Sequence, residues 1–264
     1  EGARGASVLS RAVQVRSSSM PVRSNHLRGH NATALLQGDR VNYFGHAAIA
    51  SERRRDADFV LGAMLPDFAA MLRTVCPDAA SEPLRAGLSF HHDTDAVFHD
   101  CPTFGALNLT GLRELRAGGV GRGPARAAAH LGTELLLDAV LADQDAYRRC
   151  YLAALEHARD AARELSWRDT RAAEGFLWLT ARLHGRGVSL HEGDPERIAQ
   201  RLARALEGRP RLEPNPTELA AITRWLDQQR PRVVRAAESL LTELRHGLAL
   251  REQERARDFF PTHG

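Results

Sequence analysis

Residues 129–138 read AHLGTELLLD, and this stretch decides the fold class. His130, Glu134 and Asp138 follow one another at intervals of four, and three consecutive leucines precede Asp138. Side chains four apart lie on one face of an α-helix, about 5–6 Å apart at Cβ. The stretch therefore predicts a largely buried helix that carries one imidazole and two carboxylates along a single face.

A second stretch, residues 90–99, repeats the pattern. It reads FHHDTDAVFH and places His91, Asp95 and His99 at the same spacing. Two such stripes that face each other in a helical bundle can build a metal site from side chains of separate helices. Imidazole nitrogen together with carboxylate oxygen suits zinc, manganese or iron. A bound cation would also explain acidic side chains among leucines, since a buried carboxylate without a partner is costly.

Two isolated polar residues lie in otherwise apolar segments, and we expect them to join this site. His46 lies within NYFGHAAI, and Asp67 lies within LGAMLPDF. A plainer alternative for Asp67 is that it follows Pro66 and simply favours the start of a helix. The two stripes also have an explanation that involves no metal, in which Asp95 belongs to a surface ion pair and Glu134 faces solvent.

The periodicity of apolar residues is helical nearly throughout from Val41 onward. Only 6% of the residues are aromatic, and alanine, leucine and arginine are abundant, which favours helices over strands. With no repeat and no convincing strand, we expect an all-α fold, a single helical bundle domain over 41–250 with a charged tail over 251–264. The expected helices span residues 43–54, 57–74, 82–100, 103–117, 124–142, 144–165, 169–185, 194–207 and 216–247.

The basic residues are unevenly distributed. All 36 are arginine, and six of them lie in the first forty residues beside only two acidic residues. Beyond residue 40, 30 arginines face 31 acidic residues, so the body has no basic excess of the kind that nucleic-acid binding needs. Residues 1–40 are rich in Ser, Arg and Gly, and we expect a disordered leader or a non-native extension there.

Several classes of protein find no support in the sequence. No window holds 18 consecutive apolar residues, which predicts no membrane span, and the lack of an apolar secretory run predicts a cytoplasmic location. The three cysteines are far apart and form no CxxC motif, which excludes a zinc ribbon and argues against a disulfide scaffold. Cys150 has no His or Asn in a recognisable register and no GxSxG motif occurs, so nucleophilic triad chemistry is not expected.

Four short motifs occur in a set order along the chain. They are NYFGH ending at His46, GAMLPDF around Asp67, GLSFHHDTD ending at Asp95, and ELLLD ending at Asp138. A weaker fifth match is RPRL, which begins at Arg209. The order and spacing of these motifs resemble those of the acyl carrier protein phosphodiesterases, a divergent all-α branch of the HD-domain metal-dependent phosphohydrolases. The similarity covers about residues 41–248.

The resemblance implies an HD-domain-like bundle with a divalent cation, usually manganese, with zinc or iron as alternatives. It implies hydrolysis of the phosphodiester that links phosphopantetheine to a serine of acyl carrier protein, which would make that protein a partner. Glu134 stands where the family has an aspartate. Five positions match the polar positions of the family and are the expected metal ligands: His46, Asp67, His91, Asp95 and Asp138.

Further residues are expected to take part in the chemistry. Glu134 or His130 would orient the attacking water or act as general acid and base, because the leaving alkoxide needs a proton. Arg209 and Arg211 are candidates for holding the phosphate, and a solvated turn is the alternative for both.

Two departures from the family pattern leave the substrate open. His92 stands where the family usually has an arginine, so it is a candidate phosphate contact without the bidentate geometry of arginine. His99 stands where an acid is common. One alternative is a zinc-dependent phospholipase-C-like hydrolase, also helical and rich in His and Asp. Another is a non-catalytic protein that binds a carrier protein or another helix through the amphipathic segment 216–247.

Overall fold

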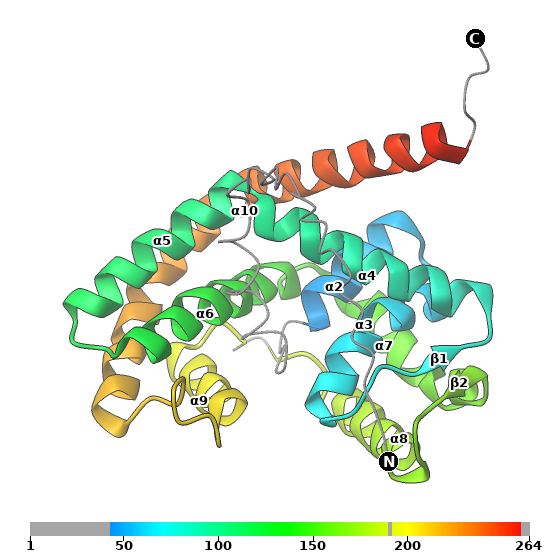
Figure 1. Ribbon diagram of the computed structural model, residues 1–264, viewed down its shortest axis with the longest axis horizontal. Coiled ribbons are helices and arrows are strands. Elements are labelled where there is room, and N and C mark those ends of the chain that lie inside the picture. Colours follow the sequence, from blue (N-terminus) through cyan, green and yellow to red (C-terminus); the bar gives the residue numbers. More distant parts are fainter. Residues whose placement is uncertain (1–42, 190–191, 260–264) are drawn as a thin grey trace, which may run out of the picture. The chain divides into compact units, whose positions relative to one another are not determined.

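The computed structural model describes residues 43–189 and 192–259, and the leader predicted over 1–40 lies outside the described residues. Helices dominate the described part, as Figure 1 shows, so the all-α prediction is confirmed. The helices are α2 (Tyr43–Arg53), α3 (Ala57–Met71), α4 (Glu82–Asp100), α5 (Pro102–Ala117), α6 (Arg122–Ala142), α7 (Asp145–Ala161), α8 (Thr170–Arg186), α9 (Pro195–Leu206) and α10 (Pro216–Phe259). A short 3-10 turn spans Ala162–Glu164.

Two details differ from the sequence prediction. Strands β1 (Asp78–Ala79) and β2 (Leu165–Ser166) form a two-residue antiparallel pair where no strand was expected. In addition, α10 continues as far as Phe259, whereas the sequence predicted a helix that ends at residue 247. Ion pairs accompany this extension, in which Glu252 pairs with Arg53 of α2 and Arg255 pairs with Asp93 of α4.

Helix α6 is central to the bundle, since it contacts α2, α5, α7, α9 and α10. Its leucines are buried on several sides, and Gly132 lies against the ring of Trp225 in α10. Glu134 and Asp138 share this helix and are themselves buried. The burial that the sequence pattern indicated therefore holds for both carboxylates.

Helices α3 and α4 cross backbone to backbone at two glycines. A Cβ on Gly62 would overlap the carbonyl oxygen of Leu84, and a Cβ on Gly87 would overlap that of Phe59. No other residue permits so close an approach of two helix backbones. The crossing brings the following turns of the two helices together, and those turns carry Asp67 and His91.

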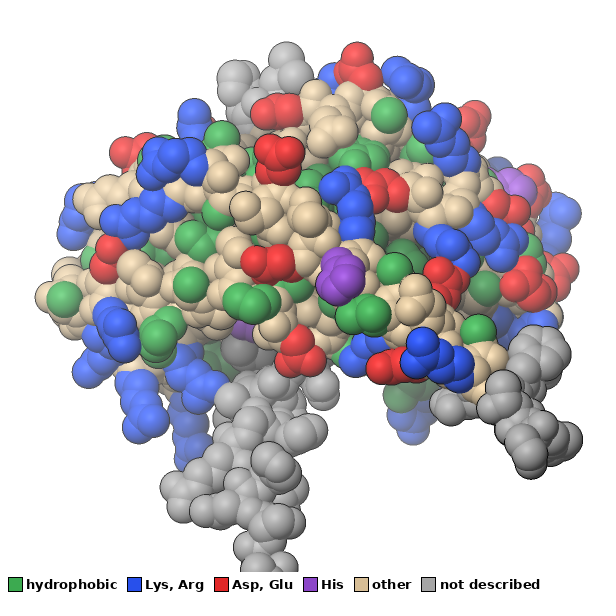
Figure 2. Space-filling view, turned by 90° about the horizontal axis from the view of Figure 1, so that it is seen from above, with side chains coloured by type: hydrophobic (Ala, Val, Ile, Leu, Met, Phe, Trp, Pro, Cys, Tyr) green, Lys and Arg blue, Asp and Glu red, His purple; other side chains and the backbone are tan. Residues whose placement is uncertain are grey.

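Two observations concern the outside of the molecule. Within the described residues, no helix combines the length and the apolar character that a membrane crossing requires. Figure 2 shows one face of the molecule, on which arginine and acidic side chains are interspersed.

Candidate metal centre

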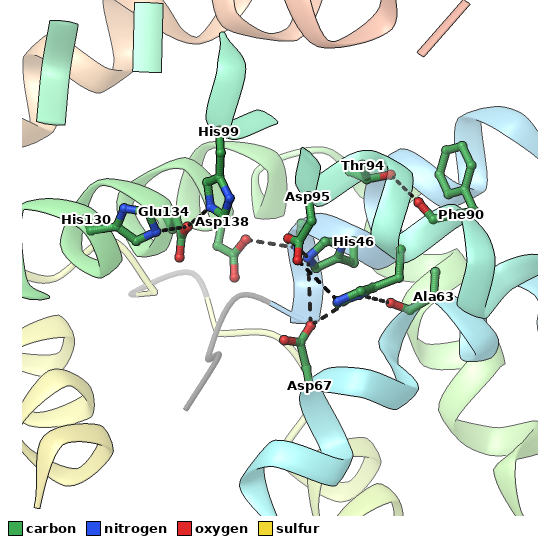
Figure 3. A network of polar contacts seen from close by, with 12 residues as sticks. His46, Ala63, Asp67, Phe90, Thr94, Asp95, His99, His130, Glu134 and Asp138 are labelled. Atoms are coloured by element: carbon green, nitrogen blue, oxygen red, sulfur yellow. Dashed lines mark hydrogen bonds and ion pairs between the residues drawn. The ribbon is translucent and has the colours of Figure 1, made fainter. Parts of the chain in front are cut away.

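Four polar side chains from three helices converge in the interior, and we call them the inner cluster: His46 of α2, Asp67 of α3, and His91 and Asp95 of α4. Figure 3 shows His46, Asp67 and Asp95 pointing toward one another. His46 Nε2 lies 3.3 Å from Asp95 Oδ1 and 3.9 Å from Asp67 Oδ2. His91 Nε2 lies 3.6 Å from Asp95 Oδ2. Asp67 and His91 are fully buried, His46 is 4% exposed and Asp95 is 8% exposed, so four of the five predicted ligands meet in a largely buried position.

The surroundings of His91 orient its ring. Its Nδ1 donates a hydrogen bond of 2.8 Å to the carbonyl oxygen of Ala63, which can only accept. In the neutral ring, Nε2 is then the nitrogen that carries the lone pair, and it faces Asp95. The ring also stacks on that of His46, with the ring centroids 4.0 Å apart. A hydrogen bond from the far nitrogen is the usual way in which a protein positions a metal-binding histidine.

The inner cluster fits a divalent cation. Ligand atoms of His46, Asp67 and His91 all lie within 4.8 Å of one another, and Asp95 adds a further carboxylate. Two carboxylates in a dry interior repel each other, and a cation removes that repulsion. Two imidazoles with two carboxylates are donors that manganese, iron and zinc accept, so the donor set does not distinguish the metals.

A second group, which we call the outer cluster, lies beside the first and consists of His99 of α4 with His130 and Glu134 of α6. Glu134 Oε1 lies 3.1 Å from His130 Nε2 and 3.3 Å from His99 Nε2. The side chain of His130 is 14% exposed and that of His99 is 21% exposed. Burial alone would raise the pKa of Glu134, but the nearby imidazoles, His130 foremost, hold that pKa well below its usual range.

Asp138 lies between the two clusters in Figure 3. Its Oδ1 accepts a 2.9 Å hydrogen bond from the backbone N–H of Gly45, where a side chain would collide with the carboxylate. Burial raises the pKa of Asp138, the charge of Arg201 opposes that rise, and the charges of Glu134 and Asp67 add to it. The sequence predicted Asp138 as a ligand, and it lines the same small cavity as His46, Asp95 and Glu134, so this role stays a prediction.

A small cavity joins the clusters. Its volume is about 30 Å³, which is room for a water molecule or an ion. The titratable residues along its wall come from both clusters and from the region between them: His46, Asp95, Glu134 and Asp138.

The basic side chains near the centre are not the predicted ones. Arg201 of α9 and Arg186 at the end of α8 line a second cavity that also touches Asp138. By contrast, the carbonyl oxygen of Arg211 lies against Gly123 at the start of α6. Fifteen helical residues separate Gly123 from Asp138, which corresponds to roughly 22 Å along the axis. The structure therefore does not bring Arg211 to Asp138.

Two predicted residues, His92 and Arg209, remain to be located. His130 and Glu134 meet as expected, and their third partner, His99, was visible in the stripe of α4 but received no role. His92 is exposed, with its ring edge-on to that of His91. Arg209 lies with Arg211 in the turn between α9 and α10 and lines neither cavity described here. The i, i+8 spacing from His91 was the one signal that could have identified His99.

Comparison of the chain with family models, with curated proteins and with solved structures finds no match.

Proposed function

We propose that the chain is a metal-dependent phosphodiester hydrolase, similar in its chemistry to the acyl carrier protein phosphodiesterases and acting in the cytoplasm. One observation carries the proposal: His46, Asp67, His91 and Asp95 converge from three helices in a buried position with ligand-like spacing. The resemblance in the sequence motifs supports manganese as the cation and a carrier protein as the partner.

The inner cluster would hold the cation, which when bound supplies Lewis acidity and a water of lowered pKa for attack on phosphorus. His91 presents Nε2 because Ala63 accepts the proton of Nδ1. The leaving alkoxide needs a proton. Glu134 and Asp138 line the cavity beside Asp95, so one of these two carboxyl groups is placed to handle that proton.

Arg201 and Arg186 are the cations best placed to hold the phosphate. Both line the cavity on the far side of Asp138 and both pair with Glu192, at 3.2 and 3.6 Å respectively. A phosphate that reached this cavity would find two guanidinium groups whose planar donors suit its oxygens. They replace Arg209 and Arg211 in this role.

The test is a hydrolysis assay with two substrates, bis(p-nitrophenyl) phosphate and holo-acyl carrier protein, on the metal-stripped chain with and without added Mn²⁺. We expect Mn²⁺-dependent turnover that Asp67→Asn abolishes and that His157→Gln, at a partly exposed histidine outside both clusters, leaves intact. Hydrolysis of the small ester alone would support the chemistry and overturn the carrier-protein substrate. Absence of turnover with either substrate would overturn the proposal.

A further inference from the structure

We infer that the outer cluster is a second cation site, with donors that suit zinc. This inference goes beyond the proposed hydrolase, because the site depends only on its own three side chains and would bind an ion whether or not the chain hydrolyses a phosphodiester. It concerns His99, His130 and Glu134, which lie apart from the ligands assigned to the inner cluster.

The spacing of the three side chains matches a tetrahedral site. Zinc binds imidazole nitrogen and carboxylate oxygen at about 2.0–2.2 Å, which places neighbouring ligand atoms of a tetrahedron roughly 3.3–3.6 Å apart. The two separations measured from Glu134 Oε1, 3.1 Å to His130 and 3.3 Å to His99, are close to that value. All three ligand atoms lie within 4.8 Å of one another, so small movements of the side chains would bring them to coordination distance of an ion at their centre.

The direction of the two imidazoles supports the same reading. Both present Nε2 to a single oxygen atom of Glu134, although they come from different helices. Their rings are held from behind by an aromatic shell, in which Phe104 lies edge-on to His130 at 5.2 Å and tilted against His99 at 5.8 Å. An apolar shell behind convergent nitrogens limits rotation of the rings and the access of water.

The charge of the outer cluster differs from that of the inner one. With two neutral imidazoles and one carboxylate, a divalent ion in the outer cluster keeps a net positive charge. In the inner cluster, two carboxylates neutralise the charge of a divalent ion. Two histidines with one glutamate also leave the fourth position of a tetrahedral zinc open. Because His99 and His130 are partly exposed, that position is accessible to an anion or to water from outside.

This assignment changes the roles expected from the sequence. Glu134 and His130 would hold an ion in place of acting as general acid and base. Asp138 would then be the carboxyl group of the shared cavity that remains for proton transfer. The competing explanation is that the two histidines bind no ion and only stabilise the buried charge of Glu134 by hydrogen bonds.

Zinc binding to the full chain separates these explanations. The metal-stripped protein is titrated with Zn²⁺ by calorimetry, and bound ions are counted by elemental analysis after dialysis. The variants are His130→Gln, the more exposed His99→Gln, and Asp67→Asn of the inner cluster, with His157→Gln as the matched control. Circular dichroism and thermal melting verify that each variant folds. If His130→Gln does not fold, His99→Gln is the deciding variant.

We expect two ions per chain in the unmodified protein and in His157→Gln. His99→Gln and His130→Gln should each lose one ion, with a fall in affinity of at least about 100-fold, the upper end of what loss of an outer-shell partner costs. Asp67→Asn should keep the ion of the outer cluster. The Co²⁺ form of Asp67→Asn should show the intense absorption of a tetrahedral site.

Two results would overturn the inference. If His99→Gln binds as many ions as the unmodified protein and with the same affinity, the outer cluster is not a cation site, and the proposed hydrolase is unaffected. If the unmodified protein binds no Zn²⁺ and no Mn²⁺, both proposals fail. Conversely, if the chain shows no hydrolysis but loses one ion in His99→Gln, the hydrolase proposal fails and the second site stands.

Discussion

The inner and outer clusters use the same residue types in different settings. The inner cluster brings four side chains from three helices into a largely buried position and depends on the close crossing of α3 and α4. The outer cluster spans only α4 and α6, and both of its histidines are partly exposed. The difference shows that spacing along a helix creates a candidate ligand, whereas the packing of helices decides whether it sits in a closed or an open site.

The largest expected effect comes from removing a carboxylate of the inner cluster. Asp67→Asn takes a buried negative charge away from His46 and His91, so we expect loss of Mn²⁺ binding and a fall in phosphodiesterase activity of at least about 100-fold. Hydrolysis of bis(p-nitrophenyl) phosphate measures it. Full activity in this variant would show that the inner cluster is not catalytic.

The next largest effect concerns the helix crossing. Gly87→Ala inserts a Cβ against the carbonyl oxygen of Phe59, and overpacking of this kind costs about 1–3 kcal/mol of stability. We expect weaker Mn²⁺ binding at the inner cluster and unchanged Zn²⁺ binding at the outer one, as measured by calorimetry alongside urea unfolding. An equal loss at both clusters would contradict the view that only one of them depends on the crossing.

Two neighbouring carboxylates should respond in opposite ways in the metal-free protein. Glu134→Gln removes hydrogen bonds to a charged group and should lower the free energy of unfolding by about 1–3 kcal/mol at neutral pH. Asp138→Asn should raise it, because a buried carboxyl group whose pKa is raised in the fold opposes folding once it ionises. Thermal melting with a chelator present measures both changes.

The signs of the pH dependence follow from the two pKa shifts. Because the pKa of Glu134 is lowered in the fold, its contribution to stability is present above its ordinary value of 4.5 and is lost as the pH falls toward the lower folded value. Because the pKa of Asp138 is raised, stability falls as the pH rises from its ordinary value of 3.8 toward the folded value. Equal pH profiles for Glu134→Gln and Asp138→Asn would contradict this account.

The smallest effect is expected outside both clusters. The pKa of Glu52 is lowered, mainly by its hydrogen bonds from Arg245, in a partly exposed position. Its contribution is present above its ordinary pKa of 4.5 and disappears as the pH falls below it. Solvent screening limits that contribution to about 1 kcal/mol or less. Glu52→Gln should therefore melt slightly earlier at pH 7 and bind both ions normally. Loss of either ion would mean that general destabilisation explains the other variants.

Much of the fold could be predicted from the sequence. Apolar periodicity located the helices, and the interval of four between His91 and Asp95 placed both side chains on one face. His46 and Asp67 stood out because their neighbours in the sequence are apolar. Periodicity, spacing and isolated polar residues are local features of the chain, so they can be recognised in a single sequence.

The parts of the fold and of the site that the sequence did not predict depend on tertiary packing. The spacing of residues along the chain does not determine that packing. Gly62 and Gly87 look like ordinary helical glycines until their backbones are seen to touch. His99 is a ligand candidate only because α6 brings Glu134 beside it. Likewise, Arg201 reaches the neighbourhood of Asp138 from α9, whereas the RPRL motif that contains Arg211 turns toward the start of α6.

The central claim, that the inner cluster holds a divalent cation, is tested most directly by anomalous scattering from crystals of the full chain soaked in Mn²⁺. We predict a manganese peak at coordination distance from His46, Asp67, His91 and Asp95. Occupied crystals that place manganese elsewhere, or soaked crystals without a peak among these four side chains, would contradict the claim.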